Sequence, residues 1–402
     1  MTRVLIVEDM ATYRTIIARS LAEIDDTKVV GRVSNGKKAL DFLEKNEVDL
    51  ITLDVEMPIM DGLATLKELR KRRLHIDVVM LSGLTDQAAS LTIKCLELGA
   101  VDFVLKPATN SFAENQKLLV DSLSAIIANL RRRAAFRSRF KSNQRTKTSA
   151  PPASGTPSRR TSLLKDKPAG STSSAPAAPA PSQEAKPATG FRRRLSLPRP
   201  KLLLIGVSTG GPKALSEVFD HLRGPLPFPI LIVQHMPPKF TKSLADSLNR
   251  KTDIEVSEAM DGDLVKPNCA YIAPGGYHMV LMKDEDFGYI LATNQTPPVN
   301  SCRPSVDVLF DSVQPFFNQG EIAALIMTGM GRDGADSCER LHKKRHYIMS
   351  QSAETCTIYG MPKAVEDLGL PDQVLDLEDI APTIMKLGKQ AAMFPGKNIW
   401  GE

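Results

Sequence analysis

The sequence predicts an α/β protein with two doubly wound parallel-sheet domains joined by a disordered linker. Three observations support this prediction: a length of 402 residues, short apolar runs alternating with amphipathic patterns, and one stretch without either pattern. A chain this long exceeds the usual size of one domain, about 100–200 residues. Alternation of strand and helix is typical of a parallel sheet with helices on both faces.

The first domain is predicted over residues 1–133. Its apolar runs are short enough to be buried strands, and the segments between them carry apolar residues at three- and four-residue spacing, as amphipathic helices do. Helical examples are residues 37–43 and 91–98. The five predicted strands are Val4–Val7, Lys28–Val30, Leu50–Leu53, Val78–Leu81 and Phe103–Leu105.

The linker is predicted over residues 134–200, which are rich in Pro, Ala and Ser and lack a periodic apolar pattern. This stretch holds fourteen Lys or Arg but only two acids, whereas the whole chain has a net charge of +6. The rest of the chain therefore has a net charge of −6. We interpret the basic clusters at 131–133 and 192–194 as solvated charge, and the acidic remainder argues against binding to nucleic acid.

The second α/β domain is predicted over residues 201–391, followed by a C-terminal tail over 392–402. Its apolar runs again alternate with helical patterns. The predicted strands include Leu202–Ile205, Ile230–Val233, Cys269–Ile272 and Ala323–Met327.

Composition excludes several classes of protein. Apolar residues make up 42% and charged residues 24%, as in globular proteins. No apolar run approaches the roughly 18 residues of a membrane-spanning helix, and no secretory signal precedes the first strand. The five cysteines are odd in number and form no C-x-x-C pair, so we expect reduced thiols without assigned chemistry. The protein is expected to be soluble and cytoplasmic, without membrane insertion.

Polar side chains follow the strands of the first domain. Carboxylates of Glu8, Asp9 and Asp54 come at two strand ends, and Ser82 and Lys106 at two others. Because parallel strands end at one edge of a sheet, these groups are expected to converge. Gathered carboxylates repel one another unless a hard cation such as Mg²⁺ lies among them. Each acid alone is as well explained as a solvated loop residue.

These residues, with Met57–Gly62 after Asp54, closely resemble the receiver domain of two-component response regulators, which has a flavodoxin-like fold. The resemblance covers about residues 1–130. It implies phosphorylation of Asp54 by a chemotaxis histidine kinase. Further roles implied by the resemblance are Mg²⁺ binding by Glu8, Asp9, Asp54 and the Glu56 carbonyl, phosphoryl contact by Ser82 and Lys106, and an aromatic switch at Phe103.

A second group of candidate catalytic residues lies after the linker. The segment Gly206–Gly210 reads G-x-S-x-G between a predicted strand and a predicted helix, which would expose the hydroxyl of Ser208. Taken alone, such a turn more often binds phosphate or simply connects two elements. Pro212 fits the first helical turn and leaves nearby backbone N–H groups available to an oxyanion.

A serine hydroxyl needs a base, and His235 directly follows the next predicted strand. Asp333 lies in a glycine-rich loop after a third strand and could orient the imidazole. A lone histidine at a strand end is more often structural. The order Ser, His, Asp differs from the Ser, Asp, His order of α/β-hydrolases.

Five blocks in order resemble the Rossmann-like catalytic domain of chemotaxis protein-glutamate methylesterases: residues 206–211, 234–237, 303–307, 328–335 and 359–362. The resemblance covers about residues 200–390. It implies a phosphorylation-activated hydrolase of glutamate methyl esters on chemoreceptors, releasing methanol in chemotaxis adaptation, and a glutamine deamidase. It implies recruitment to receptor arrays and no cofactor at the esterase site. The implied roles are nucleophile for Ser208, base for His235, orienting carboxylate for Asp333, and oxyanion donation by the backbones of Thr209 and Met330.

The chain departs from this family in three places, one of which is residues 350–354, where the family's acidic Gln-containing pattern is only partly kept. The linker is longer than usual, with a root-mean-square span of about 40–50 Å, so inhibition by the receiver would depend on complementary domain surfaces. Residues 342–346 form a charged segment where relatives have a small turn, and we expect it to alter receptor contact.

Two other functions fit parts of the pattern. Receivers often precede DNA-binding domains, although no helix-turn-helix pattern follows the linker here. The same three catalytic residues would also serve a small-molecule esterase or deacylase.

Overall fold

The computed structural model describes residues 1–145, 198–393 and 399–400 of the chain. The first sheet contains five parallel strands in the order β2-β1-β3-β4-β5, which is the strand order of flavodoxin-like folds and confirms the predicted class. The strands are β1 (Thr2–Val7), β2 (Thr27–Val33), β3 (Leu50–Asp54), β4 (Asp77–Ser82) and β5 (Asp102–Leu105).

Side chains of β1 alternate between two apolar layers, as the period of a strand requires. Val4 and Ile6 pack against α1 and α5, whereas Leu5 and Val7 face the opposite layer. Three of the helices begin with side-chain caps, from Asn35, Asp61 and Thr85. The helices are α1 (Ala11–Ala22), α2 (Gly36–Leu43), α3 (Gly62–Lys71), α4 (Asp86–Glu97) and α5 (Phe112–Arg145).

The predicted linker starts inside helix α5, whose backbone is helical as far as Arg145. The apolar pattern that defined the first domain ends near 133, and a helix can continue beyond it without an apolar face. Residues 146–197 of the predicted linker lie outside the described residues. The domain boundaries therefore stay predictions.

The second sheet contains seven parallel strands in the order β14-β13-β12-β6-β7-β9-β8. It extends the predicted sheet by further strands, of which Glu255–Glu258 and Gln373–Leu375 are short and hold only one or two apolar residues. The strands are β6 (Leu202–Val207), β7 (Ile230–Gln234), β8 (Glu255–Glu258), β9 (Cys269–Ile272), β12 (Ile322–Ile326), β13 (Tyr347–Gln351) and β14 (Gln373–Leu375).

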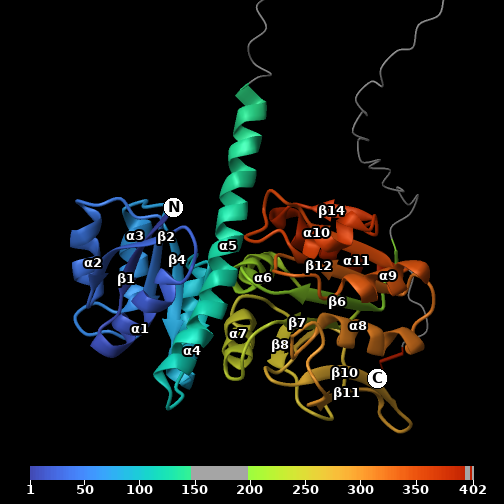
Figure 1. The fold of residues 1–402 in the computed structure, drawn as a ribbon. Helices are drawn as coiled ribbons and strands as arrows, with labels where there is room; N and C mark the ends of the chain where they lie inside the picture. The colour runs from blue at the N-terminus through green and yellow to red at the C-terminus, as the bar shows by residue number, and fades with distance from the viewer. Residues whose placement is uncertain (146–197, 394–398, 401–402) are drawn as a thin grey trace, which may run out of the picture. The chain divides into compact units, whose positions relative to one another are not determined.

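Helices cover both faces of this sheet, as Figure 1 shows. Leu203 and Ile205 of β6 face the layer of α6, α7 and α11, while Leu202 and Leu204 face α8, α9 and α10. The helices are α6 (Gly211–His221), α7 (Phe240–Asn249), α8 (Val306–Val313), α9 (Ala335–Lys343), α10 (Met361–Asp367) and α11 (Leu377–Met393), with a 3₁₀ turn at Gln314–Phe316.

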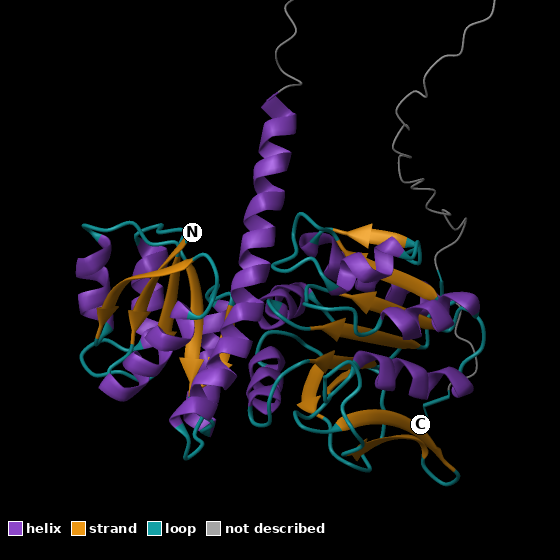
Figure 2. Ribbon diagram, in the orientation of Figure 1, coloured by secondary structure: helices purple, strands orange, loops and turns teal. Residues whose placement is uncertain are grey.

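An antiparallel hairpin that the sequence did not predict stands apart from the parallel sheet (Figure 2). It consists of β10 (His278–Asp284) and β11 (Gly288–Asn294). Trp400 from the predicted tail packs against Tyr289 of this hairpin and against Phe317. Among the described residues, none of the helices combines the length and apolar character needed to cross a bilayer.

Candidate catalytic and phosphoacceptor sites

The predicted catalytic residues lie after three neighbouring parallel strands. β6 lies between β12 and β7, and Ser208 and His235 directly follow β6 and β7. Asp333 lies in the loop between β12 and α9. Because all three strands run the same way, their carboxyl ends meet at one edge of the sheet, where α/β proteins commonly bind ligands.

Ser208 occupies a tight strand-to-helix turn. Its backbone N–H donates to the Thr328 carbonyl (3.0 Å), and its own carbonyl accepts from the Gly211 N–H (2.8 Å) and from the Gln234 side-chain amide (2.9 Å). Gly210 has a φ of 79°, in the left-handed region that favours glycine. A β-carbon at Gly211 would lie 1.9 Å from the Gln234 Oε1, so this turn requires both glycines.

Gly329, in the loop that carries Asp333, lies directly against Ser208. A β-carbon at this glycine would be 2.8 Å from the Ser208 Cβ and 2.4 Å from the Met361 Sδ. The Gly329 N–H also donates to the Ile358 carbonyl (3.0 Å), which fixes the loop beside α10. The absence of a side chain at this position thus allows the β12–α9 loop to approach the serine.

His235 and Asp333 form a direct hydrogen bond. The distance from His235 Nε2 to Asp333 Oδ2 is 2.8 Å. A carboxylate can only accept, so the ring donates from Nε2, and in the neutral ring the lone pair is on Nδ1. Burial alone would lower the pKa of His235, but Asp333 and then Cys302 raise it to about 9. Burial alone would raise the pKa of Asp333, and the bonds from His235, Asn300 and Val306 lower it to about 2.

Asp333 is held by more donors than the histidine alone. The Asn300 amide (2.9 Å) and the Ser305 hydroxyl (2.8 Å) donate to Oδ1, and the Val306 N–H (2.6 Å) donates to Oδ2. Val306 begins helix α8, so the positive end of that helix also faces the carboxylate. The Asn300 amide further donates to Asp307 (2.8 Å).

Sequence reasoning assigned no role to Asn300, Ser305 or the start of α8, although the segment 303–307 stood out as a motif. The available signal was a serine immediately before a helical pattern, which marks a helix N-terminus. No local pattern indicates that this N-terminus faces a carboxylate 26 residues or more further along the chain.

Cys302 lies on the other side of the imidazole. Its Sγ is 3.6 Å from His235 Nδ1, the ring nitrogen that Asp333 does not hold. Within the described ranges, the Ser208 hydroxyl forms no hydrogen bond, so the structure joins the base to the acid but not to the serine. No role was predicted for this cysteine from the sequence.

The two predicted oxyanion donors differ in their surroundings. Among the described residues, neither the Thr209 N–H nor the Met330 N–H has a hydrogen-bond acceptor. The Thr209 carbonyl accepts from the Thr328 hydroxyl (2.9 Å), which fixes the orientation of this peptide. The Thr209 hydroxyl donates to Asp102 of β5 (2.7 Å), whose pKa is raised to about 6 by burial, against the effect of this bond.

The predicted acid cluster of the first domain is brought together. Carboxylate oxygens of Glu8, Asp9 and Asp54 lie within 4.8 Å of one another. The ammonium of Lys106 lies 2.8 Å from Glu8 and 2.7 Å from Asp54. Burial first, and then the charge of Asp54, raise the pKa of Glu8 to about 7; burial also raises the pKa of Asp54. One ammonium does not offset three crowded carboxylates, so the cluster suits a divalent cation.

The other predicted receiver residues have specific neighbours. Thr92, which the sequence analysis did not select, donates its hydroxyl to the Ser82 Oγ (2.8 Å). The Glu56 N–H donates to Asp54 over a long 3.4 Å. Phe103 stacks on Phe240 of α7, with ring centroids 4.5 Å apart.

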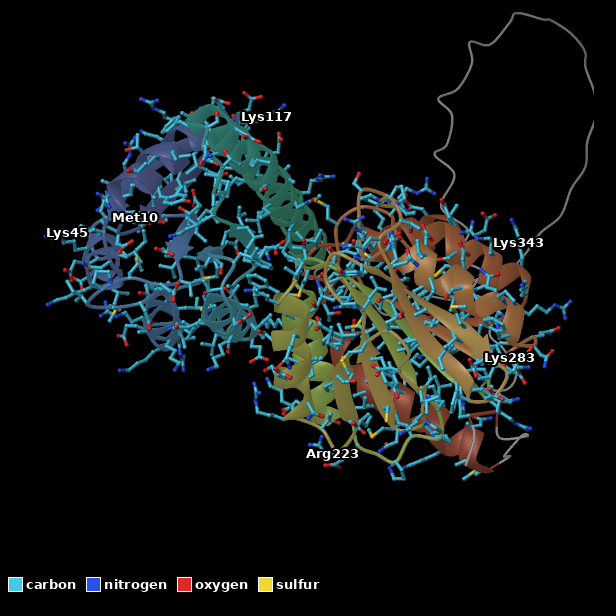
Figure 3. All side chains as sticks on the ribbon, turned by 90° about the horizontal axis from the view of Figure 1, so that it is seen from below. Met10, Lys45, Lys117, Arg223, Lys283 and Lys343 are labelled. Carbon is cyan, nitrogen blue, oxygen red and sulfur yellow. The ribbon has the colours of Figure 1, made fainter. Side chains whose placement is uncertain are left out.

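The charged segment 342–346 lies away from the catalytic edge. It precedes β13, at the amino ends of the parallel strands, whereas Ser208 and His235 follow the carboxyl ends. Lys343 extends into solvent from the outside of the domain (Figure 3). His346 is buried, and its Nδ1 accepts from the Ile322 N–H (3.3 Å). The expected effect of this segment on receptor contact stays a prediction.

Comparison with known proteins identifies one family for each part of the chain. Residues 4–114 match the response regulator receiver domain, and residues 203–384 match the CheB methylesterase family. The chain is 41% identical to a protein-glutamate methylesterase/protein-glutamine glutaminase of Desulfotalea psychrophila, over 95% of this chain and 97% of that protein. A protein of the same name from Treponema denticola is 37% identical, over 97% and 99%.

Among solved structures, the chain is similar to the Thermotoga maritima CheB methylesterase catalytic domain. The identity is 37% and the TM-score 0.45, and the match covers 47% of this chain and 98% of that one. The two relatives match nearly the whole chain at more than 30% identity, which establishes its family. The chain belongs to the protein-glutamate methylesterase/protein-glutamine glutaminase family, with an N-terminal response regulator receiver domain.

Proposed function

We propose that this protein is a serine hydrolase, controlled by phosphorylation of its receiver domain, that removes methyl groups from glutamate side chains of chemoreceptors. The single observation that best supports the proposal is the His235–Asp333 hydrogen bond at the strand edge that also carries Ser208. Glutamine side chains have the same carbonyl geometry, so deamidation belongs to the same proposal.

The first half of the reaction forms an acyl-enzyme. The Ser208 oxygen attacks the ester carbonyl while His235 Nδ1 takes the hydroxyl proton. Asp333 keeps the second ring proton on Nε2 and stabilises the imidazolium. The C–O bond to the methoxy group then breaks, and the imidazolium gives its proton to the leaving methanol.

The second half releases glutamate. Water loses a proton to His235 and attacks the acyl carbon, and Ser208 leaves with that proton. Both tetrahedral intermediates carry an oxyanion, for which the unpaired N–H groups of Thr209 and Met330 are the proposed donors. In deamidation the same steps release ammonia instead of methanol.

The receiver supplies the control. We assign Asp54 as the phosphoryl acceptor, with Lys106 and Ser82 as contacts of the phosphoryl oxygens. Glu8, Asp9, Asp54 and the Glu56 carbonyl would hold Mg²⁺, which neutralises charge on the carboxylates and the incoming phosphoryl group. No cofactor is assigned to the esterase site.

Two contacts offer a route from the receiver to the serine turn. Phe103, the proposed switch residue, stacks on Phe240, and its neighbour Asp102 accepts from the Thr209 hydroxyl. Phosphorylation that changes the position of β5 would release Thr209, the residue next to the nucleophile. These contacts support inhibition through complementary surfaces.

The proposed partners are methyl-accepting chemoreceptors as substrates and a chemotaxis histidine kinase as phosphodonor. The proposed location is the cytoplasm, at receptor arrays. The acidic balance outside residues 134–200 argues against a nucleic-acid partner.

The direct test is methanol release from methylated receptor membranes. Wild type should release methanol faster with a small-molecule phosphodonor, Asp54→Ala should lose this stimulation, and Ser208→Ala should be inactive in both conditions. Turnover of generic nitrophenyl esters without methanol release from receptors would instead indicate a small-molecule esterase.

A further inference from the structure

A cysteine faces the ring nitrogen of His235 that Asp333 does not bind. Cys302 Sγ lies 3.6 Å from His235 Nδ1, and ligand atoms of His235, Cys302 and Asp333 all lie within 4.8 Å of one another. The other four cysteines are buried, whereas Cys302 is only partly so. Cys302 is thus the thiol that a solute reaching the catalytic edge would meet.

Sulfur and imidazole nitrogen are together the preferred ligands of zinc and related soft divalent cations. Typical bonds are about 2.3 Å from Zn²⁺ to sulfur and about 2.0–2.1 Å to nitrogen, so the two atoms of a tetrahedral site lie roughly 3.5 Å apart. The observed separation of 3.6 Å matches this spacing. The two bonds together span about 4.3–4.4 Å, so an ion bound by both atoms would lie to one side of the line that joins them.

Asp333 accepts a hydrogen bond from the opposite nitrogen of the ring, Nε2. Its bond to Nε2 directs the Nδ1 lone pair toward Cys302, as a carboxylate does behind a metal-bound histidine. The Asp333 oxygens already accept from Asn300, Ser305 and Val306. Asp333 therefore orients the imidazole and is not itself a ligand of the ion.

We propose that His235 and Cys302 form an inhibitory site for a thiophilic divalent cation of the zinc class. An ion on Nδ1 occupies the lone pair that must receive the serine proton, so the metal-bound enzyme cannot start acylation. Two protein ligands leave the other positions to water, which makes the ion exchangeable and the inhibition reversible. The inhibitory effect rests on the proposed function; the binding itself does not.

Binding is tested with Co²⁺ as a spectroscopic substitute for Zn²⁺ on the full-length protein. Excess Mg²⁺ is present to occupy the carboxylate cluster of the receiver. Wild type should bind Co²⁺ with a thiolate-to-cobalt charge-transfer band that Zn²⁺ abolishes. Cys302→Ala should lose the band and bind at least about tenfold more weakly, and His235→Gln should do likewise.

Two variants serve as matched controls for binding. Cys95→Ala makes the same chemical change at a buried cysteine of the receiver and should keep the band. Ser208→Ala removes the proposed nucleophile and should also keep it. Absence of the band in wild type, or its persistence in Cys302→Ala, would overturn the proposal.

Inhibition is measured by methanol release at increasing Zn²⁺, with each variant compared only with its own metal-free rate. Wild type should lose most of its activity over the range in which Zn²⁺ displaces Co²⁺, and a chelator should restore it. Cys302→Ala should require at least about tenfold more Zn²⁺ for the same fractional loss. Equal sensitivity of the two proteins would refute the inhibitory role. A protein that shows the band but releases no methanol would refute the esterase proposal alone.

Discussion

The imidazole of His235 donates from Nε2 to Asp333 over 2.8 Å, although the two residues follow strands separated by β6. The long β12–α9 loop spans this gap, passing Ser208 at Gly329. The base is therefore held by its Nε2. Nδ1 is the ring nitrogen left for proton transfer, and it lies 3.6 Å from the Cys302 Sγ. This geometry leads to four predictions.

The first prediction concerns pH. Burial would lower the pKa of His235, but Asp333 and Cys302 raise it to about 9, and only the neutral ring can accept the serine proton. We therefore expect kcat/KM to rise with pH and to level off above about 9. A pH profile of methanol release between 6 and 10 measures this.

Asp333→Asn is the matched variant for the pH prediction. It removes the anion that raises the pKa, so the midpoint should move to lower pH while the plateau falls by about 10³–10⁴-fold. A midpoint that is unchanged in the variant would contradict this assignment.

The second prediction concerns Asn300, whose amide donates to Asp333 and Asp307. Asn300→Asp keeps the shape and tolerates the φ of 51°, but replaces a donor with a third carboxylate. A hydrogen bond to a charged group contributes about 1.5–3 kcal/mol, so kcat/KM should fall roughly 10–100-fold. Asn318→Asp, in a surface turn of the same domain, is the control. Equal rates in the two variants would show that the Asn300 amide does not contribute to catalysis.

The third prediction concerns Gly329. Gly329→Ala places a β-carbon within 2.8 Å of the Ser208 Cβ, so the serine must shift. A displacement of about 1 Å costs on the order of 10²-fold in rate, and kcat/KM should fall by that factor. Gly83→Ala, where nothing lies within 4 Å, should leave the unstimulated rate unchanged.

Gly329→Ala combined with Met361→Ala separates the two close contacts. The double variant relieves the contact with the Met361 Sδ but not the one with Ser208, so activity should stay low. Recovery of activity would show that Ser208 was not displaced.

The fourth prediction concerns control by the receiver. Asp102→Ala removes the acceptor of the Thr209 hydroxyl, so methanol release without phosphodonor should increase, while the stimulated rate should change little. Asp86→Ala breaks an exposed ion pair with Lys239 (3.5 Å) and should change the rate little. An Asp102→Ala protein with the unstimulated rate of wild type would contradict the proposed route.

The fold was largely predictable because its signals are local. Apolar runs such as Leu202–Ile205 and amphipathic segments such as 91–98 indicate strands and helices without knowledge of their neighbours. The hairpin His278–Asp284/Gly288–Asn294 was missed because its burial is mixed along both strands. Short edge strands such as Gln373–Leu375 hold too few residues for a pattern.

The candidate site was predictable where a reactive side chain lies at the end of a predicted strand, as at Ser208 and Asp54. The residues that support it were not. Asn300 and Cys302 lie in a loop whose contacts with His235 and Asp333 span dozens of residues, and Thr92 acts through a buried hydroxyl on a helix. Such contacts depend on tertiary packing, which a local pattern does not record.

The central claim is that Ser208 is the nucleophile activated by His235 and Asp333. Labelling the protein with a fluorophosphonate and locating the label by peptide mass spectrometry tests it most directly. The account predicts label on Ser208 in wild type and no label in Ser208→Ala or His235→Gln. Label on Cys302, or an unlabelled Ser208 in a protein that releases methanol, would contradict it.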